Sequence, residues 1–166
     1  MKKRFYIFLD IDGVLNDEEH AKKNMVNGIV DFFNPVSVDA LNYLIFKLKS
    51  NYEVEIYTIS SWKNIDVIKR YFDMYGVSVD GINLSRLGDA SKPTGKDILD
   101  FLKCRDEREN YVVIDDEERD YQAYIPINRI IKTDFYKDSL RKYMVDEFLE
   151  KNNVLKIVEK RHLKSK

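Results

Sequence analysis

Two aspartates near the start of the chain, Asp10 and Asp12, follow a short apolar run and stand two positions apart. A carboxylate can attack phosphorus and form an aspartyl phosphate, and a second one nearby can protonate the leaving group and then activate water. Alternate residues of an extended chain point to the same side. The spacing therefore predicts two acids that serve one reacting centre, with Gly13 permitting a sharp turn behind them.

Further polar side chains follow other apolar segments of the chain. Ser60 and Ser61 follow the second such segment, Lys92 lies in a loop, and Asp115 and Asp116 follow a later apolar run. Ligands of open α/β sheets bind beyond the carboxyl ends of the strands, where these side chains would meet. Clustered carboxylates repel one another and need a cation, and their oxygens suit Mg²⁺. The hydroxyl groups and the lysine could bind phosphate oxygens.

The elements that must position these side chains alternate between strand and helix. Runs rich in β-branched and aromatic residues predict five strands, over Arg4–Leu9, Glu53–Ser60, Val77–Leu84, Tyr111–Ile114 and Arg129–Lys132. Helical spacing predicts helices over Ser37–Lys49, Ile65–Tyr75, Lys96–Lys103 and Ser139–Lys151, whereas Asn16–Asn24 reads as a polar loop. This alternation indicates an α/β fold, a Rossmann-like three-layer α/β/α sandwich with a mostly parallel five-stranded sheet.

The composition is that of an ordinary globular domain. The chain has 166 residues, 44% of them hydrophobic and 34% charged, so a single domain over residues 1–166 is the simplest expectation. A formal net charge of −1 gives the whole molecule no electrostatic attraction to nucleic acid or membrane. Cys104 is the single cysteine, which excludes an intrachain disulfide. Because every apolar run is short, we expect no membrane partner and a cytoplasmic location.

Four segments resemble, in order, the motifs of the haloacid-dehalogenase-like (HAD) hydrolases. "FLDIDGVLN" is similar to motif I, an apolar strand followed by Asp-x-Asp-Gly, and "EIYTISSW" is similar to motif II, a strand ending in Ser or Thr. "KPTGKDILDFL" resembles motif III, a Lys-Pro segment before a helix, and "VVIDDEERD" resembles motif IV, a strand ending in acids. The resemblance spans roughly residues 4–132 and implies a phosphatase that uses Mg²⁺.

The resemblance also implies roles for the acids. Asp10 would be the nucleophile, and Asp12 would be the general acid/base that lends its backbone carbonyl to Mg²⁺. Asp115 and Asp116 would complete the metal shell, and which of the two touches the metal stays open. Asp10 is expected to be a metal ligand as well.

In this resemblance, residues of motifs II and III would bind the phosphate. Ser60 would hydrogen-bond the phosphoryl group, with Thr58 and Ser61 as alternatives because the end of the strand is not fixed by the sequence. Lys92 would neutralise charge on the phosphoryl group, with Lys96 as its rival.

A finer resemblance is to compact, capless members related to the phosphatase domains of nucleic-acid repair proteins. The insert over about residues 16–36 is too short for a large cap, and "SSW" follows the second strand. An open site would admit a bulky substrate such as a phosphorylated polynucleotide end. A small-molecule phosphatase acting on nucleotides or sugars and a non-catalytic phosphate-binding module remain alternatives. Trp62 is expected to pack, and the basic tail over about 156–166 to be a solvated end.

Overall fold

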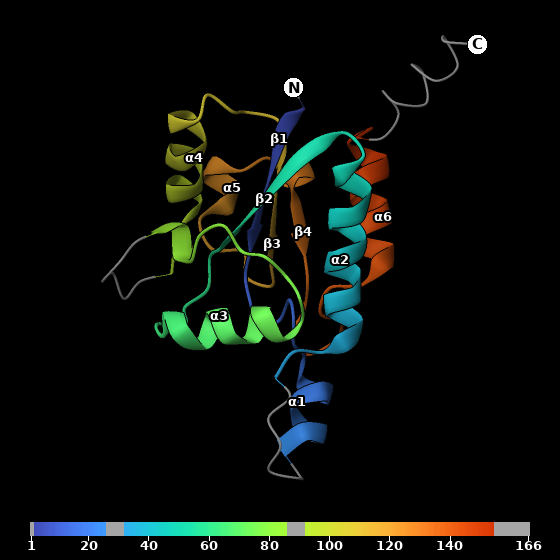
Figure 1. The fold of residues 1–166 in the computed structure, drawn as a ribbon. Helices are drawn as coiled ribbons and strands as arrows, with labels where there is room; N and C mark the ends of the chain where they lie inside the picture. The colour runs from blue at the N-terminus through green and yellow to red at the C-terminus, as the bar shows by residue number, and fades with distance from the viewer. Residues whose placement is uncertain (1, 26–31, 86–91, 155–166) are drawn as a thin grey trace, which may run out of the picture.

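The central sheet is parallel throughout and is built from strands that are distant in sequence. The computed structural model describes residues 2–25, 32–85 and 92–154, so the basic tail and part of the insert lie outside it (Figure 1). Within this part of the chain, four strands pair in the order β2-β1-β3-β4. Their bounds are Lys3–Leu9 (β1), Tyr52–Thr58 (β2), Tyr111–Asp115 (β3) and Ile130–Lys132 (β4). All three pairings are parallel, so the carboxyl ends of the strands share one edge.

Helices cover both faces of this sheet. Their bounds are Glu18–Met25 (α1), Pro35–Lys49 (α2), Ile65–Met74 (α3), Gly95–Cys104 (α4), Tyr121–Tyr124 (α5) and Lys142–Lys151 (α6). Figure 1 shows α2 and α6 on one side of the sheet and α4 and α5 on the other. This arrangement confirms the predicted three-layer α/β/α sandwich. None of these helices is long and apolar enough to cross a bilayer, within the residues described.

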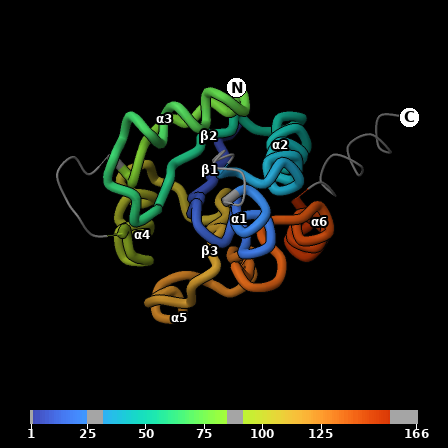
Figure 2. The backbone as a smooth tube through the Cα atoms, turned by 90° about the horizontal axis from the view of Figure 1, so that it is seen from below, coloured from blue at the N-terminus to red at the C-terminus, as the bar shows by residue number. Residues whose placement is uncertain are grey.

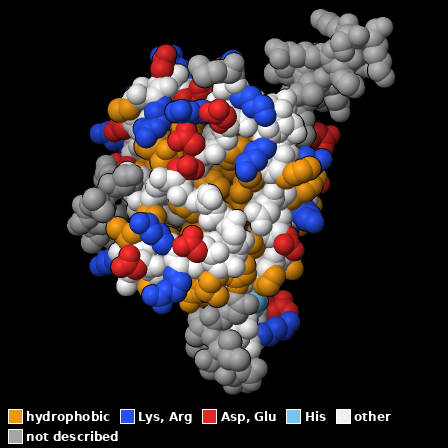
Figure 3. All heavy atoms as spheres, in the orientation of Figure 1, with side chains coloured by type: hydrophobic (Ala, Val, Ile, Leu, Met, Phe, Trp, Pro, Cys, Tyr) orange, Lys and Arg blue, Asp and Glu red, His pale blue; other side chains and the backbone are white. Residues whose placement is uncertain are grey.

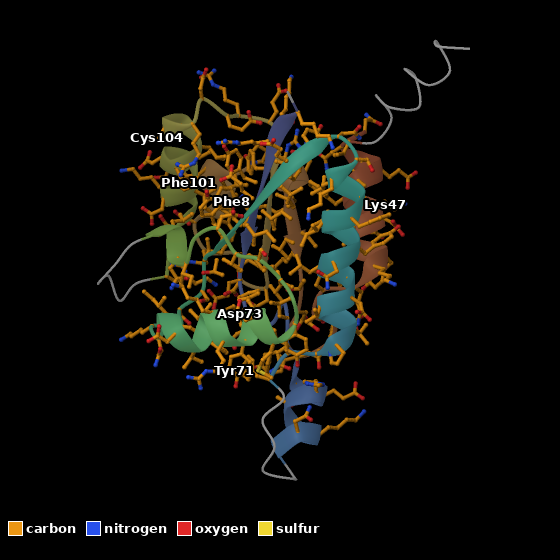
Figure 4. The ribbon with its side chains drawn as sticks, in the orientation of Figure 1. Phe8, Lys47, Tyr71, Asp73, Phe101 and Cys104 are labelled. Atoms are coloured by element: carbon orange, nitrogen blue, oxygen red, sulfur yellow. The ribbon has the colours of Figure 1, made fainter. Side chains whose placement is uncertain are left out.

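The side chains of β1 point alternately to the two faces of the sheet, so this strand contributes to both layers of the core. Every residue of Phe5–Leu9 is buried. The odd-numbered positions belong to the core cluster shared with α2 and α6, whereas Tyr6 and Phe8 belong to the cluster shared with α4. The Phe8 ring meets Phe101 of α4 edge to face at 5.6 Å, and Figure 4 shows the two side by side. A strand buried on both faces explains why this segment is apolar without alternation.

The predicted strand over Val77–Leu84 is wrong. Gly81 makes one isolated bridge to Tyr57, and Asn83–Ser85 forms a 3₁₀ turn instead. Asn83 and Leu84 have φ values of 47° and 56°, in the left-handed region that a strand cannot accommodate. The segment therefore lies against β2 without extending the sheet, and the described residues give four strands where the sequence predicts five.

The predicted loop over Asn16–Asn24 is also wrong in part, because α1 forms there. Asp17 accepts hydrogen bonds at the start of this helix, one of them from the backbone N–H of His20 at 2.9 Å. Ion pairs of Glu18 with Lys22 and of Glu19 with Lys23 follow at helical i, i+4 spacing. Figures 1 and 2 place α1 beyond the carboxyl ends of the strands. Among the described residues between β1 and α2, α1 is the one helix, and no cap domain is present there.

The Asp17 carboxylate joins three parts of the fold. It is buried and accepts from Asn34 Nδ2 at 3.0 Å, from Ser139 Oγ at 2.7 Å and from Arg141 Nη2 at 3.1 Å. Burial alone would raise the pKa of Asp17, but these hydrogen bonds and the His20 N–H hold it below its usual range. The start of the insert, the N-terminus of α2 and the segment before α6 are thus fixed to one buried charge.

We expect Asp17→Asn to lower the free energy of unfolding at pH 7 by about 2–3 kcal/mol. Because the folded-state pKa is depressed, the stabilisation is present above the unfolded value near 4 and is lost as pH falls through the folded value. Urea unfolding at pH 7 and at lower pH should therefore show the gap between wild type and variant closing with acid. Asp146→Asn, which loses one exposed bond from Tyr43, is the control and should change stability little. An equal gap at all pH values would contradict this account.

Candidate active site

Adjacent parallel strands bring three carboxylates together at the edge of the sheet. Asp10 follows β1, its N–H donates to the carbonyl of Ile114 in β3 at 3.0 Å, and Asp115 is the last residue of β3. One carboxylate oxygen from each of Asp10, Asp115 and Asp116 lies within 4.8 Å of the others. Asp10 and Asp115 are buried. The structure therefore assembles three of the four predicted metal-ligating acids around one point.

Lys92 enters this cluster from the loop before α4. Its Nζ lies 3.0 Å from Asp10 Oδ2 and 3.0 Å from Asp115 Oδ1, and its side chain is only 9% exposed. Glu117 lies 3.4 Å from the same nitrogen at the solvent side. Lys96, the rival in the sequence, has an exposed side chain on the first turn of α4. Of the two lysines, Lys92 is the one placed among the acids.

The electrostatics of the cluster leave it short of positive charge. Burial, with the neighbouring Asp115, raises the pKa of Asp10 to about 9, and burial raises the pKa of Asp116 to about 6. Burial also opposes ionisation of Asp115, but hydrogen bonds from Asp10 and Tyr121 and the charge of Lys92 hold its pKa below its usual range. One ammonium cannot balance three carboxylates, so a hard divalent cation with oxygen ligands fits this donor set.

Gly13 determines how closely Asp116 can approach. Gly13 has φ +78°, and a Cβ built on it would lie 2.1 Å from Asp116 Oδ2. A side chain at this position would therefore be strained in its backbone and would displace a carboxylate of the cluster. The glycine of the Asp-x-Asp-Gly segment thus leaves room for the acid from the fourth motif.

We expect Gly13→Ala to destabilise the protein by about 1–3 kcal/mol and to weaken Mg²⁺ binding. Gly76→Ala is a matched control, because Gly76 has φ +68° and a Cβ added there would meet nothing within 4 Å. The control should lose stability alone, whereas Gly13→Ala should also lose the rise in melting temperature that Mg²⁺ causes. Equal Mg²⁺ responses in the two variants would show that Asp116 does not need this space.

Asp12 stands apart from the other acids. Its carboxylate Oδ2 accepts a hydrogen bond from the indole Nε1 of Trp62 at 2.9 Å, and its side chain is half-buried. Metal binding through the backbone carbonyl of Asp12 therefore stays a prediction. The Asp12 side chain is held toward the segment that follows β2, which carries Trp62.

The hydroxyl groups of Thr58 and Ser60, at the end of β2, both donate to Asn83 Oδ1. Ser60 is buried, and its Oγ accepts from the Trp62 N–H at 3.3 Å. Thr58 is buried within its own bonds to Asn83, while the Ser61 side chain is exposed. Ser60 and Ser61 thus both lie at the carboxyl end of β2, as predicted, and Thr58 is occupied in holding the loop.

Asn83 is a residue that the sequence analysis missed. Its Oδ1 accepts from Ser60 N at 2.9 Å and from Thr58 Oγ1 at 3.1 Å, and its Nδ2 donates to the Trp62 carbonyl at 2.9 Å. The side chain therefore fixes the whole segment from Thr58 to Trp62. Asp80-Gly81 is a turn signal, and Asn83, two residues after Gly81, tolerates positive φ, so these residues could have argued against a strand here.

Asp120, the last acid of the fourth motif, binds the start of α4, just after the segment that carries Lys92. Asp120 accepts from Gly95 N at 2.8 Å and from Lys96 N at 3.4 Å, at the N-terminus of α4. Thr94 and Asp97 form a capping box at the same helix end. Arg119 Nη2 donates to the Lys92 carbonyl at 3.3 Å. The segment after β3 thus fixes both ends of the short stretch that carries Lys92.

Comparison with known proteins extends these observations. No curated protein matches the chain. The family described as "HAD domain in Swiss Army Knife RNA repair proteins" matches residues 6–138, a stretch that begins in β1 and ends before α6. The match confirms the predicted resemblance to a compact, capless HAD-like domain of nucleic-acid repair proteins. HAD domains typically use Mg²⁺, and the acids Asp10, Asp115 and Asp116 form a cluster that could hold such an ion. The strand ends that gather Asp10, Lys92 and Asp115 lie inside the matched stretch, and the chain belongs to this family of HAD domains.

Proposed function

We propose that this HAD-type hydrolase is a Mg²⁺-dependent phosphomonoesterase that acts through an aspartyl phosphate on Asp10. The observation that carries the proposal is the Lys92 ammonium, 3.0 Å from both Asp10 and Asp115 in a cluster of buried acids. A buried cluster of this kind is a poor source of stability, because desolvation offsets most of the attraction. Perturbed carboxylates with one cationic partner at a strand edge are typical of a catalytic centre.

The proposed reaction has two steps. Asp10 attacks phosphorus in line, and the bond from phosphorus to the leaving oxygen breaks as Asp12 gives that oxygen a proton. Water then attacks the aspartyl phosphate and gives a proton back to Asp12, which releases inorganic phosphate and restores Asp10. In this proposal Lys92 offsets charge on the phosphoryl oxygens, and Ser60 hydrogen-bonds them.

The divalent cation would be held by Asp10, Asp115 and Asp116. When bound, Mg²⁺ supplies the positive charge that favours ionised Asp10 and that offsets charge on the phosphoryl group. The raised pKa of Asp10, about 9 without a cation, supports this proposal. At neutral pH the nucleophile would otherwise carry a proton.

For the substrate we propose a phosphorylated end of a polynucleotide. The family occurs in RNA repair proteins, and the described part of the insert adds only α1 beside the site. On the face that Figure 3 shows, Lys and Arg side chains are interspersed with Asp and Glu side chains. No field of one sign spreads over that face, so recognition would depend on contacts close to the site.

The test is release of inorganic phosphate with Mg²⁺ and with a chelator. The substrates are 5′- and 3′-phosphorylated RNA and DNA oligonucleotides, mononucleotides, sugar phosphates and an aryl phosphate. A polynucleotide substrate predicts the highest kcat/KM on oligonucleotides and a fall in activity as salt rises. A preference for monomeric esters with little salt effect would favour the small-molecule alternative. Folded, Mg²⁺-loaded protein without turnover on any substrate would favour a phosphate-binding module.

A further inference from the structure

Trp62 connects the proposed acid/base to an aromatic cluster outside the carboxylate site. Its Nε1 donates to Asp12 Oδ2 at 2.9 Å, across 50 positions of sequence. We propose that Trp62 is a positioning residue that holds Asp12 for proton transfer to the leaving group. The catalytic role of Trp62 rests on the proposed function, whereas the contact between Trp62 and Asp12 is independent of it.

The indole is held from several sides. The ring of Phe32 meets it edge to face at 4.7 Å, and the ring of Tyr71 does so at 5.9 Å. Phe32 comes from the end of the insert and Tyr71 from α3, which lies toward the carboxyl ends of the strands (Figures 1 and 4). The Trp62 carbonyl accepts from Asn83 Nδ2 at 2.9 Å, and its N–H donates to Ser60 Oγ. Both the ring and the backbone of Trp62 are therefore fixed before substrate arrives.

The geometry divides the two oxygens of Asp12 between two tasks. Oδ2 accepts from the indole, which has one N–H and no acceptor atom, so this bond has a fixed direction. The other oxygen, Oδ1, can carry the proton that the leaving oxygen receives. Asp12 lies beyond the end of β1 at Leu9, where strand alternation no longer orients it. A side-chain contact is thus needed to fix the carboxylate, and Trp62 provides one.

Trp62 contacts Ser60 as well as Asp12. The backbone N–H of Trp62 binds the Ser60 hydroxyl, while the indole of the same residue binds Asp12. One residue therefore links the phosphate-binding segment after β2 to the acid/base after β1. We expect a change at Trp62 to act on the step that needs the proton more than on binding of the phosphoryl group.

The kinetic test compares two leaving groups in Trp62→Phe, which keeps an aromatic ring but removes the N–H. An alkyl ester such as a mononucleotide needs a proton on its leaving oxygen, whereas 4-nitrophenyl phosphate releases a stable phenolate and needs it far less. We expect kcat/KM to fall about 10- to 100-fold for the alkyl ester and less than about threefold for the aryl ester. Phe46→Leu, at an exposed aromatic position of α2, is the control and should show no such split.

A double-mutant cycle locates the effect. Because Trp62 acts through Asp12, adding Trp62→Phe to Asp12→Asn should cause no further loss on the alkyl ester, the substrate on which Trp62→Phe alone has a large effect. Equal losses on both esters, or additive losses in the cycle, would overturn the proposal while wild-type turnover leaves the proposed function intact. Absence of wild-type turnover would instead count against the proposed function.

The contact can be tested without any activity. Trp62 is the single tryptophan of the chain, so its fluorescence reports its surroundings directly. Asp12→Ala should shift or intensify the emission of folded protein, because a carboxylate 2.9 Å from the indole is removed. Asp66→Ala, at an exposed position of α3, should leave the spectrum unchanged. An emission spectrum that does not respond to Asp12→Ala would show that the bond is absent in solution.

Discussion

Asp10→Asn should abolish phosphate release while leaving the metal-free protein as stable as wild type or more stable. The nucleophile is lost, and residues that act as a unit lose nearly all activity together, so we expect a fall in kcat/KM of at least about 10³-fold. The stability expectation comes from the pKa of Asp10, which burial and Asp115 raise to about 9. The carboxyl group is therefore neutral at pH 7 without metal, and an amide replaces it without a new charge.

The direction of the stability change in Asp10→Asn depends on pH. A raised folded-state pKa means that Asp10 favours folding below the unfolded value near 4 and that this contribution is lost as pH rises toward about 9. Metal-free wild type should therefore lose stability relative to Asp10→Asn over that interval. Chemical unfolding in a chelator across pH measures the difference. A variant that is less stable than wild type throughout the interval would contradict a neutral, buried Asp10.

The effect of Mg²⁺ on the melting temperature tests the role of Asp10 as a metal ligand apart from its role as the nucleophile. Mg²⁺ should raise the melting temperature of wild type, because it binds the folded cluster and not the unfolded chain. The rise should be smaller in Asp10→Asn, which offers one ionised oxygen ligand fewer. An unchanged rise would mean that Asp115 and Asp116 hold the cation without Asp10.

The strand ends were predictable from the sequence, and the directions of the side chains beyond them were not. Apolar runs that stop at acids locate Asp10 and Asp115, and parallel pairing then places both at one edge. Asp12 shows the limit of this reasoning, since strand alternation predicts it beside Asp10 but its carboxylate binds Trp62. The chain leaves β1 at Leu9, so the direction of Asp12 depends on a tertiary contact from another segment.

The elements that the sequence misjudged have physical reasons. Helix α1 has only two apolar residues, Ala21 and Met25, so the repeated apolar spacing that reveals a helix is absent there. The segment before Asn83 has the β-branched residues of a strand, but positive φ at Asn83 and Leu84 turns the chain away from the sheet. Such left-handed positions depend on local turn chemistry and on contacts with β2.

Lys92→Met should lower kcat/KM by about 10²–10³-fold, the second-largest effect expected in this site. Its ammonium lies 3.0 Å from each of the two buried acids, and methionine has a similar length without the charge. Lys96→Met is the matched control, because its side chain is exposed on the first turn of α4. We expect that variant to retain activity within about threefold. The comparison decides between the two lysines that the sequence leaves open.

Metal binding distinguishes this expected loss from a collapsed site. Removing the ammonium leaves Asp10 and Asp115 with less positive charge nearby, so their demand for a cation grows. The rise in melting temperature that Mg²⁺ causes should therefore be retained or increased in Lys92→Met, even though turnover falls. A variant that loses both turnover and the Mg²⁺ response would show that Lys92 organises the carboxylates. A variant that keeps turnover would show that the acids and the cation suffice, and that the ammonium between Asp10 and Asp115 serves only to balance their charge until metal binds.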